Sequence, residues 1–449
     1  MSASLHRAVP VTQHPEEVAE LLRPSGPRGL PRPAYGGRSV PNVTRSVADA
    51  VGARVDDEPE LVPPLDPSVD PFQGRRAEGP VVVLLVDGFG WYPFDRWTGS
   101  GAGPLASAWG SHARPITTVF PTTTSAALVA LSTATPPGRS GVVGYRQFLP
   151  AHGVVADLLK MSAVGLPGSD NLVGPHWSPT VVSAAPSVFR RGVPGVALSR
   201  DRFEGTGFTR TLYDGAEYVP YATASDQAHE LVRLLGRESP PPVVYTYWDE
   251  LDAVHHLRGP TDDLFEFEAD RIAHLVSTVA RRLLPARTRS TTLLVLADHG
   301  QVPISMAAQI RVDAIPEIAR EMARPLAGDR RAAYFAARPG RLTALTEALH
   351  RHLPEGSLLL PADEAIEGGL FGPPPHHPEL RDRVGDLIAF VPEPAGIIQV
   401  PPGQTASGRV IHGAHGGLSP PELVIPLVAG PLSDFGGAPG PWAGGRGQP

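Results

Sequence analysis

Four short apolar runs, rich in Val and Leu, dominate the hydrophobic pattern of the chain. Runs of this length, unbroken by polar residues, are typical of strands that are buried on both faces of a parallel sheet. They predict strands at Val81–Val86, Val243–Tyr247, Thr291–Ala297 and Leu423–Val428.

Longer segments between these runs carry apolar residues at the spacing of an amphipathic helix. The clearest predicted helix spans Leu264–Leu284, and two others are expected at Thr124–Ser132 and Ala222–Leu235. Strands that alternate with helices indicate an α/β fold. We therefore expect a central, mostly parallel sheet sandwiched between layers of helices.

The alternation is interrupted between residues 305 and 405. This segment holds two helix-like stretches, Pro316–Ala323 and Arg341–Leu353, and a later strand-like stretch, Asp386–Val391. We interpret 305–405 as a smaller inserted α+β lobe that lies over the functional site. The core then comprises residues 79–304 and 406–430. Within the lobe, Gly368–Gly372 is a candidate substrate loop, and an ordinary surface turn is the alternative.

Both ends of the chain depart from this pattern. Residues 1–78 form a proline-rich extension in which Val43, Val47 and Val51 predict one short helix. Residues 431–449 are rich in Gly and Pro, and we expect them to be disordered.

The composition narrows the possible partners. The formal net charge is −7 and the pI is about 6.1, without Lys/Arg runs, so a nucleic-acid polymer is not expected as a ligand. The chain has 0 Cys, so any metal must be held by His, Asp, Glu or hydroxyl oxygens. No export signal and no apolar run approaching the ~20 residues of a membrane helix is visible, which predicts a cytoplasmic protein without membrane contact.

Acidic and histidine side chains lie at the ends of the predicted strands. In an open α/β sheet, ligands bind at the carboxyl ends of the strands, so these side chains should converge there. Asp and His are preferred ligands of Zn and Mn, and a pair of such ions needs about six or seven ligands. The candidates are Asp87, Asp252, His256, Asp298, His299 and His415.

A cluster of three threonines, Thr122–Thr124, precedes the predicted helix of small residues. A helix N-terminus presents free N–H groups and the positive end of its dipole, which favours an anion beside the hydroxyl. Thr124 stands at this junction and is the candidate activated nucleophile and seventh metal ligand. Thr122 and Thr123 lie earlier, where capping or shaping of the loop is their expected role.

Each of these features has an ordinary structural explanation when taken alone. Asp87-Gly88 could be a simple turn, and Asp252 with His256 could be a surface pair on a helix. His415 lies in a glycine-rich loop where an exposed histidine is common. Their joint occurrence, in order and at strand ends, favours a shared site.

Five blocks that together span residues 81–428, most of the chain, resemble the type I phosphodiesterase/nucleotide pyrophosphatase branch of the alkaline phosphatase superfamily. The resemblance implies a phosphodiesterase-like or pyrophosphatase-like hydrolase that acts on a small phosphate ester, diester or monoester, through a phosphothreonine. The blocks are VVLLVDGFGW, FPTTTSAALVALSTATPPGRSGVVGY, YTYWDELDAVHHLRGP, LLVLADHGQ and HGAHGGLSPPELVIPL.

The resemblance also assigns roles to the candidate residues. It implies that Thr124 is the nucleophile, and that two divalent ions, Zn or alternatively Mn, are bound. One ion would be held by Asp87, Asp298 and His299, and the other by Asp252, His256 and His415. Neighbouring residues compete for three of these positions: Asp249 for Asp252, His255 for His256 and His412 for His415.

Several alternatives remain open on the same fold. They are a phosphomonoesterase, a phosphoglycerate mutase-like enzyme (which normally uses serine) and a phosphonate hydrolase. A sulfatase is disfavoured because the C/S-x-P-x-R context of its nucleophile is absent. A non-catalytic metal-binding or ligand-binding relative is the alternative of another class. The sequence does not indicate an oligomeric state.

Overall fold

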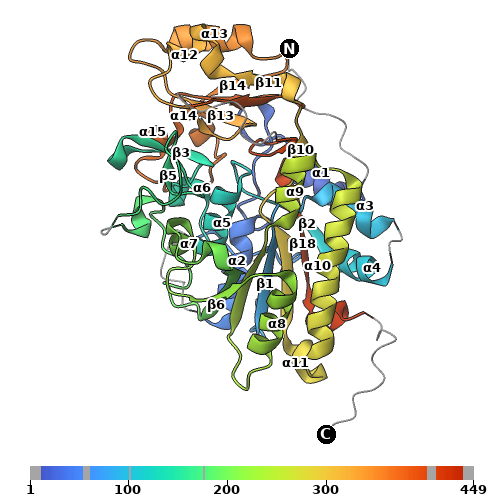
Figure 1. The fold of residues 1–449 in the computed structure, drawn as a ribbon. Helices are drawn as coiled ribbons and strands as arrows, with labels where there is room; N and C mark the ends of the chain where they lie inside the picture. The colour runs from blue at the N-terminus through green and yellow to red at the C-terminus, as the bar shows by residue number, and fades with distance from the viewer. Residues whose placement is uncertain (1–11, 54–60, 101–102, 175–176, 402–410, 438–449) are drawn as a thin grey trace.

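The computed structural model describes residues 12–53, 61–100, 103–174, 177–401 and 411–437. Its centre is a seven-stranded sheet of order β2-β18-β9-β1-β8-β6-β7 (Figure 1). Neighbouring strands from β9 to β7 run parallel, whereas β18 runs antiparallel to both β9 and β2. The predicted α/β fold with a mostly parallel sheet is therefore confirmed. The strands are β1 (Val81–Val86), β2 (Ala113–Thr117), β6 (Gly195–Arg200), β7 (Glu217–Tyr221), β8 (Val243–Trp248), β9 (Thr292–Ala297) and β18 (Val424–Pro431).

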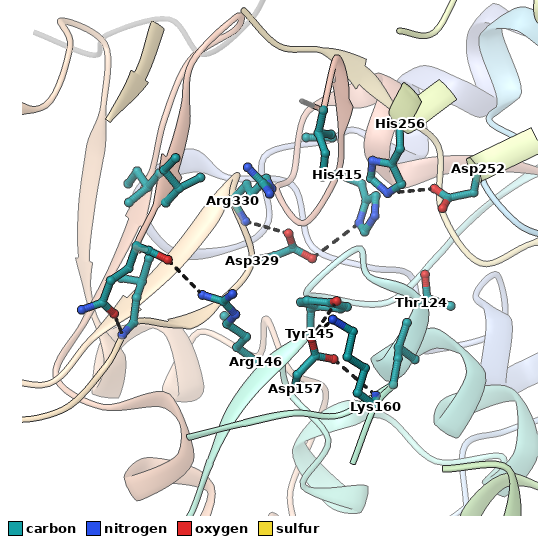
Figure 2. A pocket seen from close by; sticks show the side chains of 18 of the residues that line it. Thr124, Tyr145, Arg146, Asp157, Lys160, Asp252, His256, Asp329, Arg330 and His415 are labelled. Atoms are coloured by element: carbon teal, nitrogen blue, oxygen red, sulfur yellow. Dashed lines mark hydrogen bonds and ion pairs between the residues drawn. The ribbon is translucent and has the colours of Figure 1, made fainter. Parts of the chain in front are cut away.

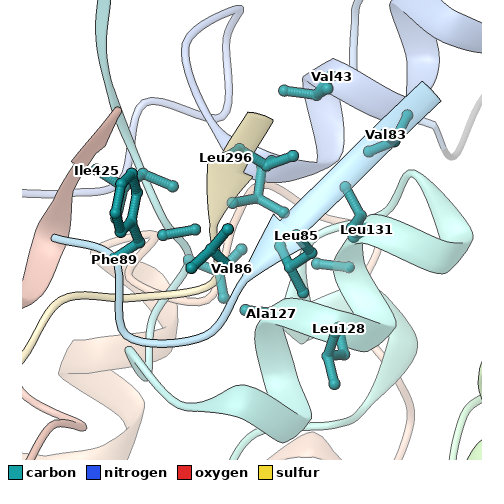
Figure 3. Packing of buried hydrophobic residues seen from close by; sticks show 14 of the residues in the cluster. Val43, Val83, Leu85, Val86, Phe89, Ala127, Leu128, Leu131, Leu296 and Ile425 are labelled. Carbon is teal, nitrogen blue, oxygen red and sulfur yellow. The ribbon is translucent and has the colours of Figure 1, made fainter. Parts of the chain in front are cut away.

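Strand β1 is buried on both faces, as its unbroken apolar sequence predicts. Val82 and Leu84 face side chains of α8 (Ala224–Leu235) and α10 (Asp262–Arg282). Val83 and Leu85 pack on the opposite face, beneath Leu131 of α5 (Thr124–Thr133) (Figure 3). Because successive side chains of a strand point to opposite faces of the sheet, β1 contacts the helix layers on both sides.

The remaining helices of the sheet's two layers follow the predicted rhythm. The predicted helix at residues 264–284 is α10, and those at 124–132 and 222–235 are α5 and α8. No helix among the described residues has the length and apolarity needed to cross a membrane. The other α-helices outside the lobe are α1 (Pro15–Leu21), α2 (Val40–Val51), α3 (Trp91–Gly99), α4 (Pro104–Ser111), α6 (Pro137–Ser140), α7 (Gly207–Leu212), α9 (Glu250–Arg258), α11 (Pro285–Ser290) and α16 (Pro420–Leu423).

A second seven-stranded sheet lies beyond the ligand-binding edge of the first, at the top of the molecule in Figure 1. Its pairings are antiparallel throughout. In order, its strands are β14 (Leu358–Pro361), β15 (Leu387–Phe390), β13 (Ala332–Phe335), β12 (Ala327–Gly328), β3 (Arg146–Leu149), β4 (Val154–Asp157) and β5 (Ser162–Ala163).

The second sheet carries helices and a hydrophobic cluster of its own. Phe335, Leu345 and Leu349 are buried in a cluster that is separate from the main core. Two further small pairings join β10 (Val302–Pro303) to β17 (Gly413–Ala414) and β11 (Gln309–Arg311) to β16 (Gly396–Ile398). The helices are α12 (Pro316–Ala319), α13 (Leu342–His352), α14 (Ala362–Glu367) and α15 (Leu380–Val384).

The sequence placed the lobe at 305–405, but its sheet also contains β3, β4 and β5, from residues 146–163. Backbone pairing joined strands that are distant in the sequence, and periodicity alone does not reveal such pairs. The predicted helix at 341–353 and the strand at 386–391 are present as α13 and β15. The helix predicted at 316–323 is shorter and ends at Ala319.

The prediction of a substrate loop at Gly368–Gly372 is wrong. Leu370 and Phe371 are fully buried, and Phe371 packs against Phe120. The carbonyl of Leu370 accepts a hydrogen bond from the hydroxyl of Tyr35. The apolar tip therefore fastens the lobe to the N-terminal segment instead of contacting a ligand.

The described residues toward both ends of the chain pack against the core. The predicted short N-terminal helix is α2, which begins at a Ser39–Asn42 capping box and packs against α5. The C-terminal disorder predicted from residue 431 does not include residues 431–437, because Leu432 and Phe435 are buried and Phe435 packs on Trp109. Residues 438–449 lie outside the described part.

Candidate active site

The register of the central sheet brings the candidate acidic residues to one edge. Val86 of β1 is paired with Ala297 of β9, so Asp87 and Asp298 follow strand ends that lie side by side. Asp252 lies in α9, which begins two residues after the neighbouring strand β8 ends. In that helix His256 lies one turn beyond Asp252 and faces the same way.

His415 reaches this edge because β18 runs opposite to its neighbours. The amino end of an antiparallel strand lies at the carboxyl ends of the parallel strands, so the loop before β18 enters the site. The pairing of Ala414 with Val302 fixes this loop beside the segment that follows His299. Strand direction thus explains how a residue before a strand joins residues that follow strands.

Asp87, Asp298 and His299 form the first group of potential metal ligands. One ligand atom from each lies within 4.8 Å of the others. His299 Nε2 is 3.5 Å from Asp87 Oδ1 and 3.3 Å from Asp298 Oδ2. These are the residues that the sequence assigned to one ion.

Each carboxylate of this group has one oxygen that accepts a hydrogen bond and one oxygen that has no hydrogen-bond partner among the described residues. Asp87 Oδ2 accepts a hydrogen bond from the hydroxyl of Tyr247. Asp298 Oδ1 accepts from the amides of Gly88, at 3.0 Å, and His299, at 2.9 Å. Asp87 Oδ1 and Asp298 Oδ2 are buried with no hydrogen-bond partner in the described part of the chain. Unpaired buried carboxylate oxygens are costly, so this arrangement fits a bound cation.

The second group contains Asp252, His299 and His415, again with ligand atoms within 4.8 Å of one another. His256 Nε2 approaches it from the rim, 3.3 Å from Asp252 Oδ1. The rings of His299 and His415 stack with centroids 3.7 Å apart. His299 therefore lies between the two groups, whereas the sequence had assigned it to the first alone.

His256, His299 and His415 all direct Nε2 toward the site, because Nδ1 of each ring is bonded to a backbone carbonyl. Their Nδ1 atoms lie 2.8, 3.1 and 3.0 Å from the carbonyl oxygens of Gly413, Gly300 and Thr122, for His256, His299 and His415 respectively. A carbonyl can only accept, so each Nδ1 carries the proton and each Nε2 has its lone pair free. This second bond is typical of histidines that ligate metals.

Burial disfavours the charged forms of the ligands. Burial raises the pKa of Asp87 well above its usual value, and the neighbouring Asp298 and Asp252 raise it further. Burial also raises the pKa of Asp252, and it lowers the pKa of His415 well below that of a free histidine. In the described part of the chain, no Arg or Lys forms an ion pair with these carboxylates. Divalent cations would supply the missing positive charge.

Thr124 is the first residue of α5 and lines the same cavity, with its Oγ1 atom 3.1 Å from His299 Nε2. Thr123 occupies the N-cap position, and its hydroxyl donates to Asp329 Oδ2 at 2.7 Å. The hydroxyl of Thr122 donates to the carbonyl of Gly417 and accepts from the amide of Gly416, in the loop that carries His415. Thr124 is thus the threonine of the three whose hydroxyl contacts the ligand groups.

The three competing residues lie outside both groups of potential metal ligands. The carboxylate of Asp249 is bonded to Arg200, at 2.9 Å, and to Arg202. His255 is buried outside both ligand groups, and burial lowers its pKa to about 4. His412 belongs to neither ligand group among the described residues.

The site opens into a cavity of about 590 Å³ between the two sheets (Figure 2). The sequence analysis missed several of its polar residues. Tyr247 lies in β8, whose residues are all buried, and no sequence signal separates it from its neighbours. The others lie in turns and strands of the second sheet, where periodicity carries little information: Tyr145, Arg146, Asp157, Lys160, Asp329 and Arg330.

Fold and site together define an α/β protein with a cluster of potential metal ligands and a hydroxyl at one sheet edge. The model of the family described as type I phosphodiesterase / nucleotide pyrophosphatase matches residues 81–418. The chain belongs to this family, and the resemblance seen in the sequence is confirmed. The family assignment supports a phosphoester hydrolase. No curated protein matches the sequence.

Solved structures share the fold at low sequence identity. Murine ectonucleotide pyrophosphatase / phosphodiesterase 5 is 18% identical with a TM-score of 0.60, over 78% of this chain and 87% of that one. Its human counterpart is 16% identical with a TM-score of 0.58, over the same shares of the two chains. Phosphonoacetate hydrolase from Sinorhizobium meliloti is 17% identical with a TM-score of 0.53, over 79% of this chain and 91% of that one.

Proposed function

We propose that this chain is a metal-dependent phosphoric ester hydrolase that uses Thr124 as a covalent nucleophile. The observation that carries the proposal is the contact of the Thr124 hydroxyl with a buried cluster whose carboxylate oxygens lack partners. The small-molecule substrate is a phosphodiester or phosphomonoester. The cytoplasmic location stays a prediction.

Two divalent cations, with Zn preferred and Mn the alternative, match the nitrogen and oxygen donors of the site. Asp87, Asp298 and His299 would hold one ion together with Thr124, and Asp252, His256 and His415 would hold the other. When bound, the cations supply positive charge that stabilises the entering and leaving oxygens of a phosphoryl group.

The protein itself positions the nucleophile and the ligands. Burial of Thr124 at the first turn of α5 points its hydroxyl at a position where free N–H groups favour an anion. Tyr247 fixes the orientation of Asp87, and Gln301 donates to Asp252. These bonds hold the ligand oxygens in place before a substrate arrives, which lowers the cost of reorganisation during the reaction.

The reaction proceeds in two displacements. Thr124 Oγ1 loses its proton and forms a bond to phosphorus while the bond from phosphorus to the leaving oxygen breaks, and the leaving group departs into solvent, where the proton is also released. Water then attacks the phosphothreonine, and the Thr124–phosphorus bond breaks, which restores the hydroxyl and releases the phosphate product. An inactive threonine-to-alanine form of the murine relative was solved in complex with AMP, which is consistent with this role for a threonine.

The test compares chelated protein with protein reconstituted with Zn²⁺ or with Mn²⁺. The substrates are bis(p-nitrophenyl) phosphate, p-nitrophenyl phosphate and the p-nitrophenyl ester of thymidine 5′-phosphate. We expect turnover of at least one ester, its loss on chelation and its recovery with metal. Full turnover by metal-free protein, or no turnover of any ester by metal-loaded protein, would contradict the proposal.

A further inference from the structure

Two arginines of the second sheet, Arg146 and Arg330, line the cavity that also contains Thr124 and Asp87 (Figure 2). We call them the arginine pair. They lie outside both groups of potential metal ligands. The mechanism of phosphoryl transfer described above gives neither of them a role.

The second sheet fixes the two arginines near each other. Arg146 of β3 is paired with Gly328 of β12, two residues before Arg330. Gly328 has φ +79°, and a Cβ atom there would meet the carbonyl oxygen of Ala332 at 2.4 Å. The turn that follows is closed by a hydrogen bond of 2.9 Å from the amide of Asp329 to the same carbonyl. A tight turn therefore presents Arg330 beside the strand that carries Arg146.

One hydrogen bond ties this turn to the start of the nucleophile helix. The Thr123 hydroxyl donates to Asp329 Oδ2 at 2.7 Å. The residues that follow these two in the chain are Thr124 and Arg330. The bond therefore links the turn that carries the arginine to the start of the helix that carries the proposed nucleophile.

The arginine pair has few partners of its own. In the described part of the chain, the guanidinium of Arg330 makes no hydrogen bond or ion pair. Arg146 makes a single long hydrogen bond, 3.4 Å, to the carbonyl of Gln399. Burial lowers the pKa of Arg330, although the charge of Asp329 raises it in part, and the nearby Arg146 lowers it further. By contrast, the buried Arg383 donates to three backbone carbonyls and to Glu379.

Among the described residues, neither acidic residue nearby forms an ion pair with the arginine pair. Asp157 accepts a hydrogen bond of 2.9 Å from Tyr145 and lies 3.7 Å from Lys160. Asp329 is bonded to Thr123, and its Oδ2 atom lies 3.6 Å from His415 Nδ1. Two guanidinium groups with free donors thus face a shared cavity, and such groups bind carboxylate or phosphate oxygens well.

We infer that the substrate carries a second anionic group, a carboxylate or a phosphate, in addition to the phosphoryl group that is cleaved. The arginine pair binds this second group while the metal-ligand cluster holds the reacting phosphorus. The inference rests on the proposed function and narrows its substrate class. It makes Arg146 and Arg330 specificity-determining residues.

The experiment measures inhibition constants against turnover of bis(p-nitrophenyl) phosphate by the metal-loaded protein. The inhibitors are three methyl alkyl phosphodiesters that differ only at the end of the alkyl chain, which carries a carboxylate, a phosphate or a neutral carboxamide. The proteins are wild type, Arg330→Gln, Arg146→Gln, the charge-conserving Arg330→Lys and the control Arg320→Gln. Arg320 lies in the lobe, bonds Glu321 and does not line the cavity, so Arg320→Gln removes one positive charge outside the cavity.

The measured quantity is the ratio of constants within each protein, so a general loss of activity cancels. We expect the wild type and Arg320→Gln to bind at least one anionic inhibitor on the order of tenfold more tightly than the carboxamide. We expect either glutamine variant to lose this preference and Arg330→Lys to retain part of it. The stronger of the two anionic inhibitors identifies carboxylate or phosphate as the natural group.

Two results would overturn the inference: no preference for either anion in the wild type, or full preference retained in both glutamine variants. If a glutamine variant does not fold, as judged by circular dichroism, Arg330→Lys and the other variant still decide the matter. Absence of turnover in metal-loaded wild type is a different result, because it rejects the proposed function itself.

Discussion

The two sheets contribute different kinds of residue to one cavity. The central sheet supplies the metal-ligand cluster at its carboxyl edge, where parallel strands in register leave little freedom of placement. The antiparallel second sheet supplies Arg146, Asp329 and Arg330 from a strand and a tight turn. On the proposed function the chemistry resides on the central sheet, and on the further inference the selection of the substrate resides on the second sheet, which faces it.

The largest effect is expected at the nucleophile. Thr124→Ala should lower turnover of a nitrophenyl phosphodiester by on the order of a thousandfold or more, because the covalent step is lost while direct attack by water remains. Steady-state kinetics at matched metal content measure this effect. Thr122→Ala and Thr123→Ala are the controls, since their hydroxyls shape the His415 loop and bind Asp329. Near-normal turnover by Thr124→Ala would show that the assignment is wrong.

A substitution in the separate cluster of the lobe tests whether the two regions are stabilised independently. Leu345 is fully buried between α13 and the second sheet. Leu345→Ala should lower the free energy of unfolding by about 2–5 kcal/mol through lost burial and a cavity. Urea denaturation measures the change. Leu342→Ala, on the same helix but 43% exposed, should change stability much less, and equal effects of the two would contradict the described packing.

The stability contributed by the junction between the two sheets should depend on pH. His377 is buried, its Nδ1 atom accepts a hydrogen bond from the amide of Glu379 at 3.0 Å, and its own amide donates to the carbonyl of Gly138. Burial, with a further effect of Arg383, lowers the pKa of His377 to about 4. In the unfolded chain the pKa is about 6.5, so between these values the unfolded state binds more protons.

The contribution of neutral His377 to the free energy of unfolding is therefore fully present above about pH 6.5. It falls as the pH drops toward about 4, by at most about 3 kcal/mol. Comparing urea denaturation of wild type and His377→Asn at about pH 7 and pH 4.5 isolates this contribution. Asparagine keeps an acceptor but does not titrate, so the variant should lose less stability on acidification. The same loss in both proteins would rule out His377 as the source.

The smallest effect is expected where the second sheet touches the catalytic edge. Asp329 accepts a hydrogen bond from Thr123 and lies near the Nδ1 atom of His415. Asp329→Asn should weaken metal affinity or turnover by on the order of tenfold, because partners behind a ligand orient it. Competition with a chelator and steady-state kinetics check both quantities. Unchanged values for both would show that the second sheet does not support the site.

Sequence reasoning succeeded where the physical signal was local and repeated. Strands β1, β8 and β9 are continuous apolar runs, and Asp87 and Asp298 follow them directly. The antiparallel direction of β18 could not be predicted, because an apolar run is the same in either direction. The role of His299 between two ligand groups also depends on register, which one sequence does not disclose.

The second sheet shows the opposite case. Strands β3, β4 and β12 have two to four residues each, too few for periodicity to be recognised. Arg146 and Arg330 are 184 positions apart in the sequence and become neighbours only through the pairing of Arg146 with Gly328. Buried Phe371 and Phe435 were mistaken for loop and tail residues because Gly and Pro surround them.

The stereochemical course at phosphorus tests the central claim, the covalent Thr124 intermediate, most directly. A chiral phosphorothioate diester would be hydrolysed in water labelled with ¹⁸O by the metal-loaded protein, and the configuration of the product determined. Two successive in-line displacements invert phosphorus twice, so the account predicts net retention. Net inversion would show a single displacement by water and would contradict the covalent role of Thr124.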